Sequence, residues 1–174
     1  MSDSSKQEYV TQTYELKDGG TPLTIDYSKE FSSDTAKVEE VKIRSIDSTK
    51  TTIGDSFLCY CRKLSNVDIS GLTNITSVGN TFLAFASALN TLDLSPMTSL
   101  TQIGDLFLKD SSNLTSLTLP NLENVTKIGG YFLYNTAVYS VDLSKISNVQ
   151  EIGIQFLGKC NNLTTVDISA AISL

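Results

Sequence analysis

The sequence predicts an α/β solenoid that is rich in β-structure, in which each coil contributes one parallel strand and a very short helical turn. A glycine that follows Ile or Val recurs with spacings of 25, 25, 25 and 24 residues, at Gly54, Gly79, Gly104, Gly129 and Gly153. Phe-Leu begins three residues after each glycine, and an apolar pattern of the form L-x-x-L-x-L follows, whose alternation is typical of a strand. A fixed period near 25 residues indicates stacked repeats.

The Phe of each repeat is expected to form the centre of the core. Equivalent residues of neighbouring coils lie one strand spacing apart, about 4.8 Å, so identical positions stack into columns. Burial of each ring contributes about 1.5–3 kcal/mol. The column consists of Phe57, Phe82, Phe107, Phe132 and Phe156. The glycine at the head of each coil is expected to supply backbone dihedrals that other residues adopt only with strain.

The length of the repeat leaves one alternative fold open. A coil of 25 residues with little helix also fits a right-handed parallel β-helix. The fourth repeat is one residue shorter than the others between Phe132 and Val138. A deletion within a strand would turn every later side chain to the opposite face, so we expect the deletion to lie in a loop.

The chain divides into a charged N-terminal segment and a repeat array. Ten of the 19 acidic residues lie in residues 1–50. Residues 1–30 predict a hairpin cap, because two alternating segments flank a Gly-rich turn. The array spans residues 31–174 and contains about six coils, of which the first is degenerate. The last repeat has no polar cap, so we expect an exposed C-terminal edge that favours self-association.

The composition excludes several classes of protein. The 174 residues contain neither His nor Trp, which excludes Ser-His-Asp and Cys-His nucleophiles and the usual zinc and non-haem iron sites. A net charge of −6 argues against nucleic-acid binding. No apolar stretch approaches the ~18 residues that a membrane span requires. Ser-x-x-Lys and Gly-rich phosphate loops are absent, so we expect no catalysis, no cofactor and no membrane insertion.

The repeat unit resembles a known family. Its pattern is visible in Ile53-Gly54, Phe57-Leu58, Cys61, Leu64, Val67-Asp68-Ile69-Ser70, Leu72 and Asn74-Ile75. This unit resembles the BspA-type leucine-rich repeat, which is known from surface proteins of bacteria and protists. The resemblance implies a right-handed leucine-rich-repeat superhelix. It also implies an extended, non-catalytic module that binds a protein partner or host extracellular matrix, often at a cell surface.

One column of the predicted strand is acidic and faces outward. It contains Asp68, Asp93, Asp142 and Asp167, with Thr118 in place of the third aspartate. One interpretation is a ladder that binds cations such as calcium, or a pair of carboxylates at the spacing of a glycosidase, which is about 5 Å. The interpretation we favour is structural, because flanking Ser, Thr and Asn residues offer hydrogen bonds and an open sheet offers no pocket.

A second column lies just before an apolar position and contains Asn74, Ser99, Asn124, Asn148 and Ser173. We expect these side chains to face inward and to satisfy the backbone groups of the turn. Four N-x-S/T sequons occur, at Asn74, Asn113, Asn124 and Asn162. The inward orientation would make Asn74 and Asn124 poor glycosylation acceptors, whereas Asn113 and Asn162 in the preceding loop remain open to modification.

The sequence leaves the cellular compartment open. Met1–Lys6 has no apolar segment and so no visible signal peptide, whereas the family resemblance favours the cell surface. Cys61 and Cys160 occupy equivalent positions four coils apart, about 19 Å at one strand spacing per coil, which is too far for a disulfide. We interpret these two and Cys59 as small core residues that are reduced, which slightly favours a reducing compartment.

The residues that vary most between coils lie around Phe-Leu. Interface hot spots favour Tyr, Trp and Arg, and the outward strand positions are nearly all Asn, Ser, Thr and Asp. We therefore predict binding through Tyr60, Phe85, Lys109, Asp110, Tyr131 and Tyr134. Protein binding or adhesion is the leading functional hypothesis. A self-associating scaffold is the alternative, and a carbohydrate-active β-helix enzyme is the remote third.

Overall fold

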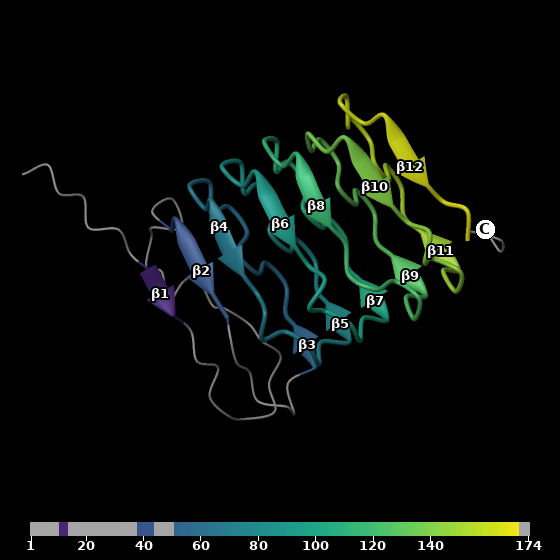
Figure 1. Cartoon of the computed structure of the whole chain (residues 1–174), viewed down its shortest axis with the longest axis horizontal. Helices are drawn as coiled ribbons and strands as arrows, with labels where there is room; N and C mark the ends of the chain where they lie inside the picture. Colours follow the sequence, from purple (N-terminus) through teal and green to yellow (C-terminus); the bar gives the residue numbers. More distant parts are fainter. Residues whose placement is uncertain (1–10, 14–37, 44–50, 171–174) are drawn as a thin grey trace, which may run out of the picture.

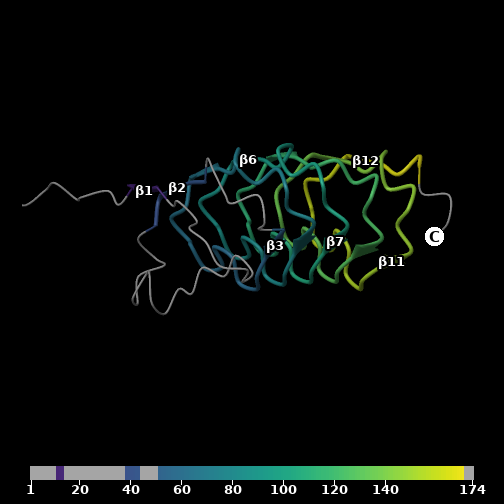
Figure 2. The same cartoon turned by 90° about the horizontal axis from the view of Figure 1, so that it is seen from below.

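The computed structural model describes residues 11–13, 38–43 and 51–170. These residues form a row of coils whose strands lie side by side from β1 to β12 (Figure 1). Seen from below, strands such as β6 and β12 lie on one side of the coils, and β3, β7 and β11 lie on the other (Figure 2). The predicted solenoid is therefore confirmed. The hairpin predicted within residues 1–30 lies outside the described residues, except that Thr11–Thr13 pairs in parallel with Glu40–Lys42.

Each complete coil carries two strands, where the sequence predicted one. The longer strands have three residues and are β1 (Thr11–Thr13), β2 (Glu40–Lys42), β4 (Asn66–Asp68), β6 (Thr91–Asp93), β8 (Ser116–Thr118), β10 (Ser140–Asp142) and β12 (Thr165–Asp167). The shorter strands have two residues and are β3 (Thr52–Ile53), β5 (Ser77–Val78), β7 (Gln102–Ile103), β9 (Lys127–Ile128) and β11 (Glu151–Ile152). The second strand arises because the polar–apolar pair before each glycine is also extended.

The two sets of strands form two different faces. The short strands make one continuous parallel sheet in the order β11-β9-β7-β5-β3. The long strands make three separate pieces, β1-β2-β4, β6-β8 and β10-β12, which we call the strand face. The register within each piece repeats the sequence period, so that Val41 lies beside Val67 and Val141 beside Val166.

The segment around Phe-Leu is not a helical turn. Its first, third and fifth residues adopt left-handed dihedrals in every coil, with φ between 51° and 63°. These five turn segments comprise residues 56–60, 81–85, 106–110, 131–135 and 155–159. Left-handed dihedrals cost about 1–2 kcal/mol for a residue with a Cβ. Hydrogen bonds between coils offset this cost, since Tyr60 N donates to Ala84 O (2.9 Å) and Leu83 N donates to Phe57 O (2.7 Å).

No helix occurs in the part of the chain that the structure describes, and hence none there that could cross a bilayer. The alternation of dihedrals explains this absence, because a helix needs consecutive right-handed residues. The predicted helical turn is therefore replaced by a segment whose amides point alternately toward the two neighbouring coils.

The glycine column is required by close approach of the coils and not by backbone dihedrals. A Cβ on Gly104 would lie 2.5 Å from the carbonyl carbon of Gly79, and one on Gly129 would lie 2.4 Å from the carbonyl carbon of Gly104. Neither glycine has a positive φ. The expectation of strained dihedrals at this position is therefore wrong, and the left-handed residues are found two, four and six positions later.

The core lies between the two sets of strands and is centred on the Phe column. Phe57, Phe82, Phe107 and Phe132 are fully buried, and Phe156 in the last described coil is partly buried. Successive rings stack with centroids 5.0–5.4 Å apart and with interplanar angles of 6–11°. The column fixes the distance between coils on the side of the turn segments.

Candidate functional site

The turn segments carry a row of aromatic rings and charged groups. At one end, Tyr60 and Phe85 stack with centroids 4.5 Å apart and ring planes 9° apart. The guanidinium carbon of Arg62 lies 5.8 Å from the centroid of the Tyr60 ring. Tyr60 is 50% exposed, so this end of the row is open to solvent. Two neighbouring coils thus present an aromatic pair with a cation near the Tyr60 ring.

Lys109 joins the two ends of the row. Its Nζ lies 4.8 Å from the centroid of Phe85 and 5.5 Å from the centroid of Tyr134, and it also pairs with the Asp110 carboxylate. Burial tends to raise the pKa of Asp110, but hydrogen bonds from Lys109 and Asn135 and the charges of Lys109 and Lys159 hold that pKa below its ordinary value. The ionised form of Asp110 is therefore favoured, and its pairing with Lys109 neutralises charge in the middle of the row.

The other end of the row is also aromatic. Tyr131 and Tyr134 meet edge to face, with centroids 5.4 Å apart and planes at 70°. Lys159 Nζ lies 5.3 Å from the centroid of Tyr134. A side-chain hydrogen bond with Tyr134, followed by the electrostatic interaction with its hydroxyl group, raises the pKa of Lys159.

The structure thus brings all the predicted binding residues into one continuous row. We call it the turn face, formed by Tyr60, Arg62, Phe85, Lys109, Asp110, Tyr131, Tyr134, Asn135 and Lys159. The sequence interpretation did not include Arg62, Asn135 or Lys159 among the binding residues. The signal was available, because Asn135 and Lys159 occupy the same position after the glycine as Tyr60, Phe85 and Asp110.

The aspartates of the strand face cap the turns that follow β4, β6, β10 and β12. In each case one carboxylate oxygen accepts a hydrogen bond from the amide two residues later: Ser70 for Asp68 (3.0 Å), and Ser95, Ser144 and Ser169 for Asp93, Asp142 and Asp167 (2.9 Å each). Hydrogen bonds from Ser144 lower the pKa of Asp142. Within residues 11–13, 38–43 and 51–170, no three acidic or Cys side chains gather where they could hold a metal ion.

The Asn column faces outward, contrary to expectation. Asn74, Asn124 and Asn148 are exposed, and the Ile or Val that follows each of them is buried. The chain turns so that the apolar residue fills the interior and leaves the amide outside. Asn148 still bonds a turn carbonyl, since its Nδ2 donates to Glu123 O of the preceding coil at 2.7 Å. Ser173 lies outside the described residues.

This orientation changes the assessment of the four sequons. Asn74, Asn113, Asn124 and Asn162 are all exposed. Burial therefore gives no reason to separate the two Asn-column sequons from the two in the preceding loop.

The three cysteines are unpaired. Cys59 and Cys61 are buried, and Cys160 is half-buried. Burial, followed by the electrostatic interaction with the neighbouring Cys59 thiol, raises the pKa of Cys61 to about 12. A thiol with so high a pKa is a weak nucleophile at neutral pH. The burial of Cys59 and Cys61 and the high pKa of Cys61 suit a packing role for these side chains.

Apolar side chains are exposed on the last described coil. Ile154 is 71% exposed, Ile168 53% and Val166 37%. In the inner coils the residues equivalent to Val166 and Ile168 are packed against a neighbouring coil, for example Leu92 and Leu94.

Comparisons with known proteins agree with this architecture. Residues 83–173 match the family described as BspA type Leucine rich repeat region (6 copies). A leucine rich cell surface protein from Faecalibacterium prausnitzii A2-165 has a similar fold, with a TM-score of 0.57 and 19% sequence identity. The similarity covers 75% of this chain and 33% of that one, so this chain spans about a third of that protein's length. No curated protein matches the sequence. With more than half of its residues matched, the chain belongs to the BspA-type leucine-rich-repeat family.

Proposed function

We propose that the chain is a non-catalytic protein-binding module of the adhesion type, and that the turn face is its contact surface. The observation that carries the proposal is the continuous contact from Arg62 through Tyr60, Phe85 and Lys109 to Tyr134 and Lys159. Tyr and Arg are the residues that most often dominate binding energy at protein interfaces. The strand face offers Ser, Thr, Asn and Asp instead.

The backbone beneath the turn face supports this role. The turn segments at residues 81–85, 106–110 and 131–135 are bonded to both neighbouring coils, and residues 56–60 and 155–159 are each bonded to one, so the aromatic rings sit on an ordered scaffold. Rings that are already ordered lose little conformational entropy when a partner binds. The surface also combines apolar area with charges of both signs, which is typical of a protein interface and its rim.

The chemistry of the chain supports a non-catalytic role. Leucine-rich-repeat families are generally non-catalytic, and this sequence has no imidazole to act as a general base. The strand-face aspartates each use one oxygen to cap a turn. No observation favours the carbohydrate-active enzyme over binding.

The experiment is a binding assay against immobilised extracellular-matrix proteins, using the wild-type chain and alanine variants. Tyr60→Ala and Phe85→Ala are expected to weaken binding about thirtyfold or more, the loss that a hot-spot residue of ~2 kcal/mol produces. Thr91→Ala and Thr165→Ala, which change exposed residues of the strand face, are the matched controls. Binding that is lost equally in the control variants would place the interface elsewhere.

Self-association is the second candidate, favoured by the exposed Ile154 and Ile168. Sedimentation velocity at increasing protein concentration distinguishes it from adhesion. The scaffold role predicts oligomers that disappear in the Ile154→Ser/Ile168→Ser variant, whereas a module that binds other proteins remains monomeric at every concentration.

A further inference from the structure

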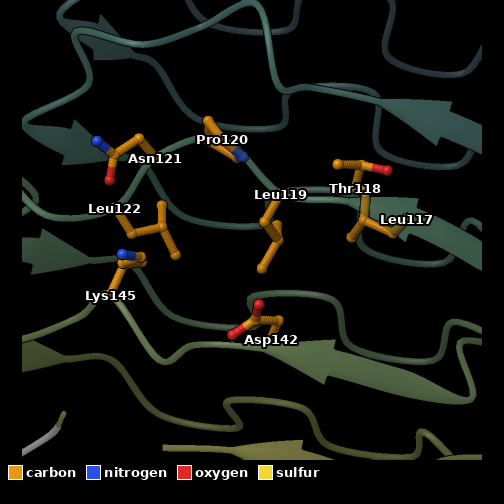
Figure 3. A pocket seen from close by; sticks show the side chains of 8 residues that line it. All are labelled: Leu117, Thr118, Leu119, Pro120, Asn121, Leu122, Asp142 and Lys145. Carbon is orange, nitrogen blue, oxygen red and sulfur yellow. The ribbon is translucent and has the colours of Figure 1, made fainter.

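A pocket opens on the strand face between β8 and β10. Its volume is about 360 Å³. It is lined by Leu117, Thr118, Leu119, Pro120, Asn121, Leu122, Asp142 and Lys145. In Figure 3 Leu119 points toward Asp142, and Leu122 lies beside Lys145. The pocket therefore combines an apolar wall from one coil with two opposite charges from the next.

The first cause of the pocket is a turn without its usual cap. Elsewhere on the strand face an aspartate accepts a hydrogen bond from the amide two residues later. After β8 these two positions hold Thr118 and Pro120. Proline has no amide hydrogen, so neither partner of the cap is present. The turn is held instead by Asn121, whose side chain accepts from Glu123 N at 3.1 Å.

The second cause is the missing pairing between β8 and β10. Leu94 N donates to Thr118 O, and Leu143 N donates to Asp167 O, each across one coil boundary. The equivalent amide of Leu119 has no such partner. The coil that contains β10 is also the one that is a residue short.

The strand face is also interrupted between β4 and β6, but there the strands remain closer together than β8 and β10 do. The separation of β8 from β10 exposes the side chains of Leu117 and Leu119, which are half-buried, whereas the equivalent Leu92 and Leu94 are buried. The pocket is thus built by residues of two neighbouring coils, at one of the two interruptions of the strand face.

The two charged groups of the pocket, Asp142 and Lys145, do not form an ion pair with each other. Asp142 accepts hydrogen bonds from the backbone amide of Ser144, at 2.9 Å, and from the Ser144 side chain, and an ionised carboxylate has further lone pairs for another donor. Lys145 forms no ion pair with Asp142, although its charge contributes to lowering the Asp142 pKa. Both groups are exposed, so a ligand in the pocket can reach them.

We propose that this pocket binds a small zwitterion with an apolar side chain, of the class of a free α-amino acid. The ligand's ammonium group pairs with Asp142, its carboxylate pairs with Lys145, and its side chain packs on Leu117, Leu119 and Leu122. A volume of 360 Å³ lies at the lower end of the ~300–1,000 Å³ typical of ligand pockets. This size suits a small molecule, and two opposite charges select a ligand that carries both.

The proposal does not depend on the turn face. The pocket lies on the strand face, and its residues are different from those of the row around Tyr60 and Tyr134. Substitutions that abolish binding at one site are expected to leave binding at the other unchanged, so each proposal can be tested independently of the other.

The first test is a titration of the intact chain with L-leucine and L-phenylalanine, followed by calorimetry and by amide chemical shifts. Because the charged groups are exposed, we expect saturable but weak binding, with a Kd of about 1 mM. Glycine lacks the apolar side chain, and N-acetyl-L-leucine amide lacks both charges, so each is expected to bind at least about tenfold more weakly. Shifts that do not saturate, or that lie away from the pocket, would overturn the proposal.

The second test uses paired variants. Lys145→Gln and Asp142→Asn are expected to reduce the affinity for L-leucine about tenfold each, because each removes one charge-assisted contact. Asp142→Asn retains an oxygen that can cap the Ser144 turn, so the fold is preserved. Lys63→Gln and Asp167→Asn are the matched controls, since both residues are exposed and lie outside the pocket. Equal loss in Asp167→Asn and Asp142→Asn, or no loss in either pocket variant, would contradict the assignment.

Discussion

The two faces of the solenoid are held together differently, although every coil contributes to both. The sheet of two-residue strands is continuous from β3 to β11, whereas the strand face has longer strands and is interrupted twice. The continuous side also has a threonine ladder, in which Thr76 and Thr101 donate to the preceding Thr carbonyl at 3.0 and 2.9 Å. Glycine next to this ladder lets the coils approach closely. The comparison shows that regular contact between coils, and not strand length, determines which side of this solenoid forms a continuous sheet.

The largest effect is expected from a substitution that disrupts the close approach of the coils beside the continuous sheet of two-residue strands. In Gly129→Ala the new Cβ would lie 2.4–2.5 Å from backbone atoms of Gly104 and Asp105, none of which can move as a flexible side chain would. We expect a loss of about 3 kcal/mol in the free energy of unfolding, measured by urea titration.

Gly130→Ala is the matched control for this variant. Its Cβ would meet atoms of Ile154 no closer than 3.4 Å, which is an ordinary contact. We expect a change within about 1 kcal/mol. Similar destabilisation by both substitutions would show that lost chain flexibility, and not close approach, explains the glycine column.

A smaller effect is expected from restoring the missing cap on the strand face after β8. The double substitution Thr118→Asp/Pro120→Ser restores both partners of the cap seen after the other strands. We expect stabilisation of about 1 kcal/mol, the usual value of such a side-chain cap, together with slower hydrogen exchange of the new Ser amide. Pro120→Ser alone supplies the donor without its acceptor, and should give less than half of the gain. An unchanged exchange rate in the double variant would mean that the separation of β8 and β10 is set by the short coil alone.

The smallest effect concerns pH. Hydrogen bonds from Ser144 lower the pKa of Asp142 in the folded chain, so the unfolded chain binds the proton more tightly. The cap therefore contributes its full stability above the ordinary aspartate pKa of about 4, and this contribution is lost as the pH falls through the lowered native pKa. Because the carboxylate is exposed, we expect about 0.5 kcal/mol or less. Thermal melts between pH 7 and pH 2 should show a flatter dependence for Asp142→Asn, and parallel curves would contradict the prediction.

The repeat and its columns could be predicted from the sequence, because a residue that recurs every 25 positions must occupy the same place in every coil. The reason for each residue was harder to predict. Glycine meets two different requirements, positive φ and close approach, and at Gly104 and Gly129 it meets the second. The left-handed dihedrals of Leu83 and Leu108 could not be expected, because leucine disfavours them in isolation. Only the hydrogen bonds to the neighbouring coils make them acceptable.

Most residues of the turn face could be predicted from the sequence, but the contacts between their side chains could not. Tyr60, Phe85 and Tyr134 stand out as large residues at variable positions. Their contacts depend on how Lys109 reaches rings in both adjacent coils, which no periodicity indicates. The pocket was missed although its signal is visible: Pro120 replaces a serine whose amide caps the other turns. That signal has meaning only once the capping role of the aspartates is known.

The hydrogen bonds of the turn segments also determine how the chain would respond to tension. They join neighbouring coils, such as Tyr60 N to Ala84 O and Leu108 N to Phe82 O. A force that pulls on the two ends would therefore separate adjacent coils and load these bonds a few at a time. Each coil that detaches releases 25 residues, or roughly 80 Å of extended chain. The solenoid can thus lengthen in steps under load while the remaining coils keep their structure.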